Sequence, residues 1–306
     1  QHWEIQNGLP QNSVSHITQD RKGYMWLATE EGLVQFDGID FHVYDRSVVN
    51  LMDHNDVVQL VADPQSGVWF SLVTGTILRF SHGQFSAPAP FPNAKVNQEG
   101  QLFVADQRGL FRLDESGWTT LFEPRFGETP AVVGDIDDRI WVGQGKSVYV
   151  WDGQKQTIDT FSIPYQGTQG SILRLVWVED RLAVATSQGL YWVMPDGTVL
   201  PDQRISIAVR DVHKDTVGTL WVAQDQLCAV QINESKVNPT SRKVLSPTEL
   251  FEDREGQIWV GTSGHGLFKF SGASFVSFGE DQGLATHPMT VLAGFQDQLI
   301  AFNRAG

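Results

Sequence analysis

Residues 20–33 read DRKGYMWLATEEGL, and residues 253–267 read DREGQIWVGTSGHGL. Both segments begin with an Asp-x-x-Gly turn, run through a Trp-containing stretch and end at a Gly-Leu pair. Gly supplies the left-handed backbone conformation that tight turns need, and a short apolar run bounded by turn residues is typical of a β-strand. The pattern therefore indicates a repeated unit of strands and turns.

The central strand of this unit recurs along the whole chain. Its copies are separated by 34 to 43 residues and centre on Trp26, Trp69, Phe103, Trp141, Ala183, Trp221 and Trp259, with a partial eighth copy at Ile300. A repeat of about 40 residues with a Trp-containing strand is typical of one four-stranded blade of a β-propeller.

The first unit shows how the strands divide. Alternating apolar residues and turn residues predict strands over 14–19, 24–29, 32–36 and 41–44. No segment carries an apolar stripe with helical spacing over three turns, so we expect essentially no helix. The predicted fold is all-β, a seven-bladed β-propeller of four-stranded antiparallel blades. Eight blades, or seven blades and the start of a second propeller, are the alternatives.

The two ends of the chain bear on how the ring closes. Residues 1–8 resemble the outer strand and exit of a later unit, over 275–283, so they could supply a ring-closing outer strand. We expect the propeller to occupy residues 1–282. Residues 283–306 are then either a partial eighth repeat or the beginning of another propeller.

Composition excludes several functional classes. The 306 residues include 36 acidic and 22 basic side chains, a net charge of −14, which disfavours binding to nucleic acid phosphates. The only cysteine, Cys228, has no partner for an internal disulfide. No apolar run approaches the roughly 20 residues that a membrane-spanning helix needs, so no membrane insertion is expected.

The chemistry-bearing residues do not form a recognisable catalytic motif. The eight histidines lack the spacing of a zinc site, and GQGKS at 143–147 lacks the glycine and helix of a phosphate-binding loop. Asp137 and Asp138 are turn residues, and the neighbours Glu30 and Glu31 cannot face each other across a sugar. We expect no metal, no cofactor and no catalytic residue. A propeller enzyme, either a lyase or a glycosidase, and a protein-interaction scaffold are the alternatives.

A ligand site is expected where loops converge on one face of a propeller. The predicted contacts are polar and come from the loops between second and third strands and from the loops that lead into the first strands: Gln11, Asn12, Glu30, Glu31, His54, Asn55, Arg108, Lys146, Gln188, Asp225 and His265. Such a surface suits a neutral or weakly anionic small molecule or oligosaccharide, and a protein is the other possible partner. Asn12 and Asn55 could instead cap their turns.

One family resemblance follows from these motifs. Residues 7–14 read NGLPQNSV, and together with the Asp-x-x-Gly turn, the Trp-Leu-Ala-Thr strand and FDG at 36–38 they resemble the two-component regulator propeller repeat. The resemblance implies a periplasmic sensor domain of a membrane receptor, whose cytoplasmic part is a histidine kinase or a diguanylate cyclase. It also implies a possible homodimer in the full receptor and no catalysis by the propeller itself.

Overall fold

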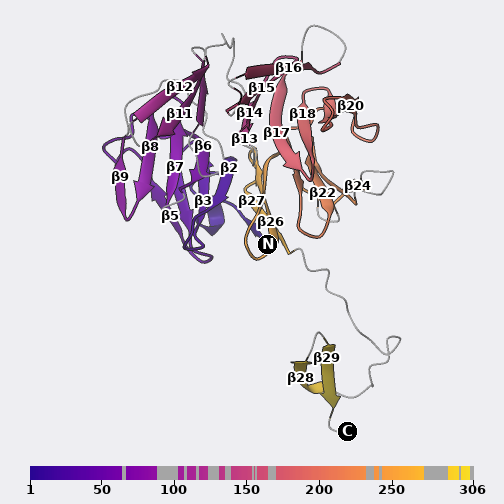
Figure 1. Cartoon of the computed structure of the whole chain (residues 1–306). Helices are drawn as coiled ribbons and strands as arrows, with labels where there is room; N and C mark the ends of the chain where they lie inside the picture. The colour runs from indigo at the N-terminus through magenta and orange to yellow at the C-terminus, as the bar shows by residue number, and fades with distance from the viewer. Residues whose placement is uncertain are drawn as a thin grey trace. The chain divides into compact units, whose positions relative to one another are not determined.

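The computed structural model describes the chain in two units, Gln1–Phe270 and Ser271–Gly306 (Figure 1). The described residues are 1–63, 67–87, 103–106, 109–114, 117–122, 131–134, 139–153, 155, 157–164, 170–231, 238–240, 243–271, 289–295 and 298–303. The first unit contains seven sheets, which we call blades 1–7, and all their strand pairs within the described residues are antiparallel.

In each sheet of blades 1–4 the strands lie side by side in the order in which they occur in the chain. Blade 1 comprises β2 (Val14–Gln19), β3 (Met25–Thr29), β4 (Gly32–Phe36) and β5 (Phe41–Tyr44). Blade 2 comprises β6 (Val57–Ala62), β7 (Val68–Leu72), β8 (Ile77–Ser81) and β9 (Gln84–Ser86). Blade 3 comprises β10 (Phe103–Asp106), β11 (Gly109–Asp114) and β12 (Gly117–Phe122). Blade 4 comprises β13 (Ala131–Gly134), β14 (Arg139–Gln144), β15 (Ser147–Asp152) and β16 (Thr157–Ser162).

The remaining blades repeat this order. Blade 5 comprises β17 (Ile172–Val178), β18 (Arg181–Thr186), β19 (Gly189–Val193) and β20 (Val199–Pro201). Blade 6 comprises β21 (Asp211–Lys214), β22 (Thr219–Ala223), β23 (Leu227–Gln231) and β24 (Asn238–Pro239). Blade 7 comprises β25 (Pro247–Glu252), β26 (Gln257–Thr262), β27 (Leu267–Ser271) and β1 (His2–Trp3).

The first strands of neighbouring blades lie against one another. Strand β2 contacts both β6 and β25, β21 contacts β25 and β17, and β17 contacts β13. The sheets thus stand side by side with these inner strands toward the middle, as in a β-propeller, and the predicted all-β class is confirmed. The described residues hold one 3-10 turn, Ile5–Asn7, and no helix long and apolar enough to cross a membrane.

Strand β1 is the outermost strand of blade 7, although it comes first in the chain. His2 pairs with Phe268 and Trp3 with Leu267, and the Trp3 ring stacks on Trp259 at 5.4 Å between centroids. Gly266 makes the approach possible, because a Cβ there would lie 2.1 Å from the carbonyl oxygen of Trp3. The beginning and end of the first unit are therefore joined within one sheet.

The Asp-x-x-Gly turn and the Trp strand of the repeat are held together by one carboxylate. In blades 1, 6 and 7 the first Asp of the turn accepts the indole N–H of the Trp six residues later: Asp20 and Trp26 at 2.9 Å, Asp215 and Trp221 at 2.8 Å, and Asp253 and Trp259 at 2.6 Å. The other oxygen accepts two backbone N–H groups of the same turn, as with Lys22 and Tyr24 on Asp20. The repeat thus satisfies its turn and its buried indole with a single side chain.

The Trp side chains fill the space between neighbouring blades. Trp26 of blade 1 packs with Val57, Leu60 and Phe70 of blade 2, and Trp259 of blade 7 packs with Ile17 of blade 1. Both rings are almost fully buried. Because an indole buries about 150–250 Å², these contacts are a major part of the inter-blade core.

The second unit contains one antiparallel pair, β28 (Met289–Phe295) with β29 (Gln298–Asn303). Ile300, at the centre of the eighth copy of the repeat, lies in β29. Residues 272–288, where the sequence places the boundary between the propeller and the last repeat, lie outside the described residues.

Candidate functional site: polar residues on the inner strands

Several of the loop residues that are predicted to contact a ligand form hydrogen bonds to other loop residues. Gln11 Nε2 donates to Glu30 Oε2 at 3.0 Å, which joins two of them across blade 1. Asn12 Oδ1 accepts the N–H of Ile5 at 2.9 Å, and Asn55 Oδ1 accepts the N–H of Arg46 at 3.1 Å. The two asparagines therefore brace loops through their side-chain oxygens.

The other nominated residues present varied degrees of exposure. Glu31, His54, Asp225 and His265 are exposed, whereas Lys146 and Gln188 are half-buried. Backbone groups of His265 and Gln188 bond to the threonine hydroxyl that ends the preceding strand, Thr262 and Thr186. His54 Nδ1 accepts the N–H of Asp56 at 3.0 Å. Arg108 lies outside the described residues.

A second set of polar groups lies on the inner strands themselves. Each member pairs in register with a small residue of the second strand: His16 with Ala28, Gln59 with Ser71, Arg174 with Ala185, Asp211 with Ala223 and Glu249 with Gly261. We call these five residues the inner-strand layer. Because the register is equivalent in each blade, the five side chains occupy the same level of the propeller.

Ion pairs connect four members of this layer across four blades. Arg174 of blade 5 donates from Nη2 to Glu249 Oε1 at 2.7 Å, and its Nε lies 3.4 Å from Asp211 Oδ1. His16 Nδ1 of blade 1 lies 3.5 Å from Glu249 Oε2. Arg174 thus reaches past blade 6 to blade 7, which places the layer at the meeting point of the inner strands.

The pKa values of the two carboxylates are shifted in opposite directions. Their side chains are each 3% exposed. Burial raises the pKa of Asp211 to about 6, with Arg174 acting in the opposite direction and Glu249 adding to the rise. Burial acts on Glu249 in the same way, but Arg174 and His16 outweigh it and hold the Glu249 pKa below its usual value. The layer therefore combines a carboxylate that ionises readily with one that takes up a proton in mildly acidic solution.

This arrangement offers both hydrogen-bond donors and acceptors at one place. The side chains of Arg174 and His16 are 22% and 18% exposed, so part of each remains accessible. The Asp211 oxygens accept the N–H groups of Leu250 and Val212, each at 2.8 Å, which fixes the carboxyl group between two blades. Within the described residues, no group of three or more His, Cys, Asp or Glu side chains could hold a metal ion.

Comparison with known proteins identifies the type of repeat. Residues 8–31 and 246–264 match the model of the two component regulator propeller, so the chain carries repeats of this type and the expected resemblance is confirmed. No curated protein sequence matches the chain.

Solved structures with the same fold include extracellular receptor domains. The extracellular domain of a protein described as the hybrid two component system BT3049, from B. thetaiotaomicron, has a TM-score of 0.73 and 20% sequence identity, covering 99% of this chain and 48% of that one. The corresponding domain of BT4673, from the same organism, has a TM-score of 0.76 and 17% identity, covering 90% and 40%. The chain thus spans half or less of these two proteins. A streptogramin B lyase, at 14% identity, has a TM-score of 0.68 and is covered over 94% of its length by 85% of this chain.

Proposed function

We propose that this chain is a non-catalytic, ligand-binding sensor propeller in the extracytoplasmic part of a membrane-bound signalling receptor, of the two-component kinase or diguanylate cyclase type. The observation that carries the proposal is the match of two separate segments to the two component regulator propeller. The likeness to extracellular domains of two-component systems supports the same reading. Ligand binding to the propeller would be signalled to the membrane through the packing of its blades.

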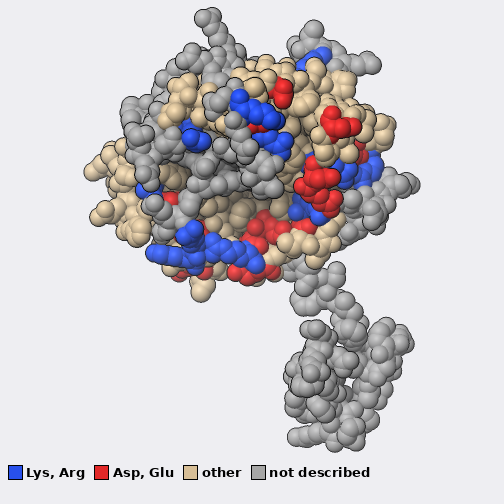
Figure 2. Space-filling view, in the orientation of Figure 1, with Lys and Arg blue, Asp and Glu red and all other residues tan. Residues whose placement is uncertain are grey.

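The ligand that fits best is a neutral or weakly anionic polyhydroxyl compound. Arg174 and His16 can donate hydrogen bonds to hydroxyl oxygens, while Glu249 can accept them. Arg174 already faces two carboxylates, so a strongly anionic polymer would meet little uncompensated positive charge. On the face shown in Figure 2, acidic and basic side chains are interspersed among the described residues, and the whole chain has a net charge of −14.

A thermal-shift screen of the purified chain against neutral and acidic oligosaccharides tests this proposal. A ligand that binds the folded state only must raise the melting temperature by mass action. The double variant Gln11→Ala with His265→Ala should lose the shift without a large change in its own melting temperature. Lys22→Ala, an exposed change in a turn at the other end of blade 1, should keep the shift. Loss of the shift in Lys22→Ala would contradict the assignment.

A propeller enzyme is the second candidate, and one observation favours it. Asp211, with a pKa of about 6, lies beside the ionised Glu249, and such a pair can donate and accept protons near neutral pH. Mass analysis of every ligand that gives a thermal shift separates the two functions. A ligand recovered unchanged supports the sensor, whereas one that is consumed by the protein but not by Asp211→Asn supports the enzyme.

A further inference from the structure

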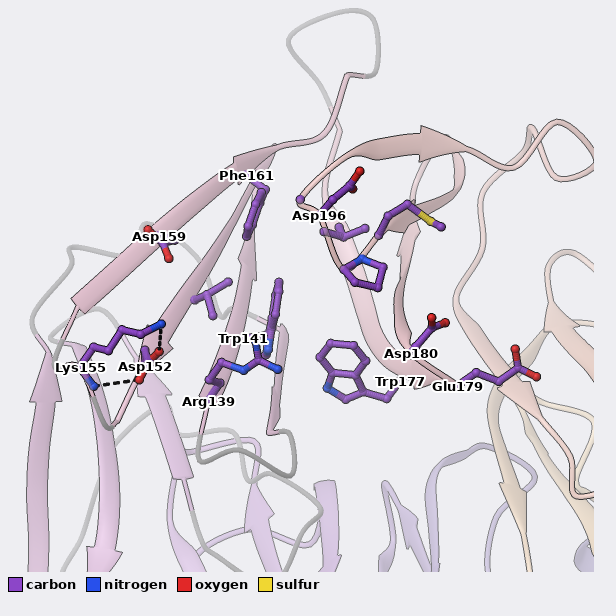
Figure 3. Close-up of a pocket in the computed structure, with 15 residues that line it drawn as sticks. Arg139, Trp141, Asp152, Lys155, Asp159, Phe161, Trp177, Glu179, Asp180 and Asp196 are labelled. Atoms are coloured by element: carbon purple, nitrogen blue, oxygen red, sulfur yellow. Dashed lines mark hydrogen bonds and ion pairs between the residues drawn. The ribbon is translucent and has the colours of Figure 1, made fainter.

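A pocket of about 570 Å³ lies between blades 4 and 5 (Figure 3). Its walls come from β14, β15 and β16 on one side and from β17, β19 and the loop 194–197 on the other. Glu179 and Asp180, between the first and second strands of blade 5, also line it. The nominated loop residues follow the second strands, at the opposite ends of the blades, so this pocket is separate from the expected ligand face.

The pocket exists because blade 5 departs from the packing of blades 1 and 2. In blades 1 and 2 the residue paired with the one before the central Trp is a phenylalanine, Phe36 opposite Met25 and Phe80 opposite Val68. Each of these rings packs on the Trp of the preceding blade, Phe36 on Trp259 at 6.1 Å and Phe80 on Trp26 at 5.0 Å.

Blade 5 has a valine at the equivalent position. Val193 pairs with Leu182, the residue before the central Ala183, and it faces Trp141 of the preceding blade. A valine lacks the ring that Phe36 and Phe80 provide, so the space in front of Trp141 is left open. Val193 and Trp141 both line the pocket.

Three aromatic rings surround this space. The Trp141 ring stacks on Phe161 with 5.8 Å between centroids and meets Trp177 edge to face at 5.3 Å. In Figure 3 the Trp177 ring extends from the end of β17 toward Trp141 and Arg139. The Arg139 guanidinium carbon already lies 6.0 Å from the centre of the Trp141 ring, so this ring is placed to receive a cation.

Negative charge is in excess at the rim. Five carboxylates and two cationic side chains line the pocket. Asp152 pairs with Lys155 at 3.1 Å, and Glu179 pairs with Lys214 at 2.9 Å. In the described part of the chain no ion pair is seen for the exposed Asp159, Asp180 and Asp196. Hydrogen bonds from Thr198 lower the pKa of Asp196, so this carboxylate stays ionised.

One polar atom of a residue that lines the pocket lacks a hydrogen-bond partner among the described residues. The indole nitrogen of Trp177 is buried, and the described residues provide it with no hydrogen-bond acceptor. Elsewhere in the propeller the indole N–H groups of Trp26, Trp192, Trp221 and Trp259 all donate to a carboxylate. A buried donor without an acceptor is unfavourable, and a ligand that carries an acceptor would relieve this cost.

We propose that this pocket binds a small organic cation with an apolar body and a hydrogen-bond acceptor. The cation lies against the faces of Trp141 and Trp177 and is attracted by the rim carboxylates, while the Trp177 N–H donates to the acceptor. The volume is within the range of about 300–1,000 Å³ that is usual for small-molecule sites.

Acetylcholine and its neutral isostere 3,3-dimethylbutyl acetate, titrated into the whole chain by calorimetry at low ionic strength, test the proposal. Both carry the same acceptor and nearly the same shape, and only acetylcholine is charged. We expect saturable binding of acetylcholine that is about tenfold tighter than that of the isostere. Equal binding of the two, or no saturable binding of acetylcholine, would overturn the proposal.

Three variants locate the site. Val193→Phe restores the ring that blades 1 and 2 carry, so it should abolish binding and leave the melting temperature unchanged or higher. The double variant Asp180→Asn with Asp196→Asn, on exposed turns, should weaken binding several-fold without unfolding the protein. Glu31→Gln, at the opposite loops, should bind as the parent does. Unchanged binding in Val193→Phe would contradict the location, and a loss in Glu31→Gln would move the site to the other face.

Discussion

Asp253 accepts the indole N–H of Trp259 at 2.6 Å from a turn that begins six residues earlier in the chain. Both side chains are buried, and the second oxygen of Asp253 also accepts the backbone N–H groups of Glu255 and Gln257. A residue that the sequence marks as a turn former is thus also the partner of the main core residue of its blade.

We therefore expect Asp253→Ala to lower the free energy of unfolding by about 2–4 kcal/mol, because it leaves a buried indole and two turn N–H groups without an acceptor. Urea unfolding measures the loss. The matched control is Asp37→Ala, an exposed carboxylate that accepts the N–H groups of Ile39 and Asp40, where we expect a much smaller loss. Similar losses in the two variants would mean that the indole bond contributes little.

The second prediction concerns Gly266, whose φ of 79° and close approach to Trp3 allow β1 to join blade 7. Gly266→Ala should displace β1 and accelerate hydrogen exchange at the N–H of Lys269, which donates to the carbonyl of Gln1. Gly264→Ala is a close control, because its φ is 87° but a Cβ there meets nothing within 4 Å. We expect the Gly266 variant to be less stable than this control by about 1–3 kcal/mol.

The third prediction is a pH dependence that arises from Asp211. Its pKa is about 6 in the folded protein and 3.8 as the ordinary value, so the folded state binds this proton more tightly than the unfolded state does. The stability that this proton contributes is present below pH 3.8 and is lost as the pH rises through about 6. Relative to the parent, the unfolding free energy of Asp211→Asn should therefore rise by about 2 kcal/mol between pH 4 and pH 7.5.

Asp196 provides a control of opposite sign for this titration. Hydrogen bonds from Thr198 lower its folded pKa, so its contribution to stability is present at neutral pH and is lost as the pH falls through the folded value. Relative to the parent, the unfolding free energy of Asp196→Asn should accordingly fall as the pH rises. If the unfolding free energies of Asp211→Asn and Asp196→Asn, each relative to the parent, changed with pH in the same way, the pKa shifts assigned to the inner-strand layer would be contradicted.

The fourth prediction concerns Arg174, which faces Asp211 and Glu249. Arg174→Gln removes the cation that faces both buried carboxylates, and we expect it to lower the unfolding free energy by about 3–5 kcal/mol at pH 7.5. The loss should be smaller at pH 5, where Asp211 holds its proton. Lys155→Gln, which removes an exposed ion pair with Asp152, should change stability by about 1 kcal/mol or less at both pH values.

Most of the fold could be predicted from the sequence, because the repeat specifies its own turns. The strands expected in blade 1 match β2, β4 and β5 and differ by one residue in β3. The expected loop at 143–147 is a hairpin in which Gln144 pairs with Ser147. Among the described residues, the one departure from the expected absence of helix is the 3-10 turn Ile5–Asn7, which directs the chain from β1 into blade 1.

The inner-strand layer could not be recognised residue by residue. Arg174, Asp211 and Glu249 are single polar residues in apolar strands, and His16 is one of eight histidines that lack the spacing of a zinc site. A positional signal does exist: His16, Gln59, Asp211 and Glu249 each lie ten residues before the central Trp of their blade, and Arg174 lies nine before Ala183. Their burial and mutual distances follow from the closed arrangement of blades, which local patterns do not report.

The pocket between blades 4 and 5 was also missed, because it depends on what a blade lacks. Val193 is an ordinary strand residue in sequence, and only the register with Leu182 shows that it replaces a phenylalanine. The same blade carries its Trp on the third strand, where Trp192 pairs with Ala183 and donates to Asp202 at 3.0 Å.

The pairing of β1 with β27 also constrains the order of events during synthesis. His2 and Trp3 leave the ribosome before blades 1–6, yet their partners Phe268 and Leu267 emerge only after those six blades have been made. Until then β1 has no hydrogen-bonded neighbour, and such a free strand edge can pair with the wrong chain. The nascent protein therefore completes its ring in one late step, and a ribosome that stalls before blade 7 would leave an open, association-prone product.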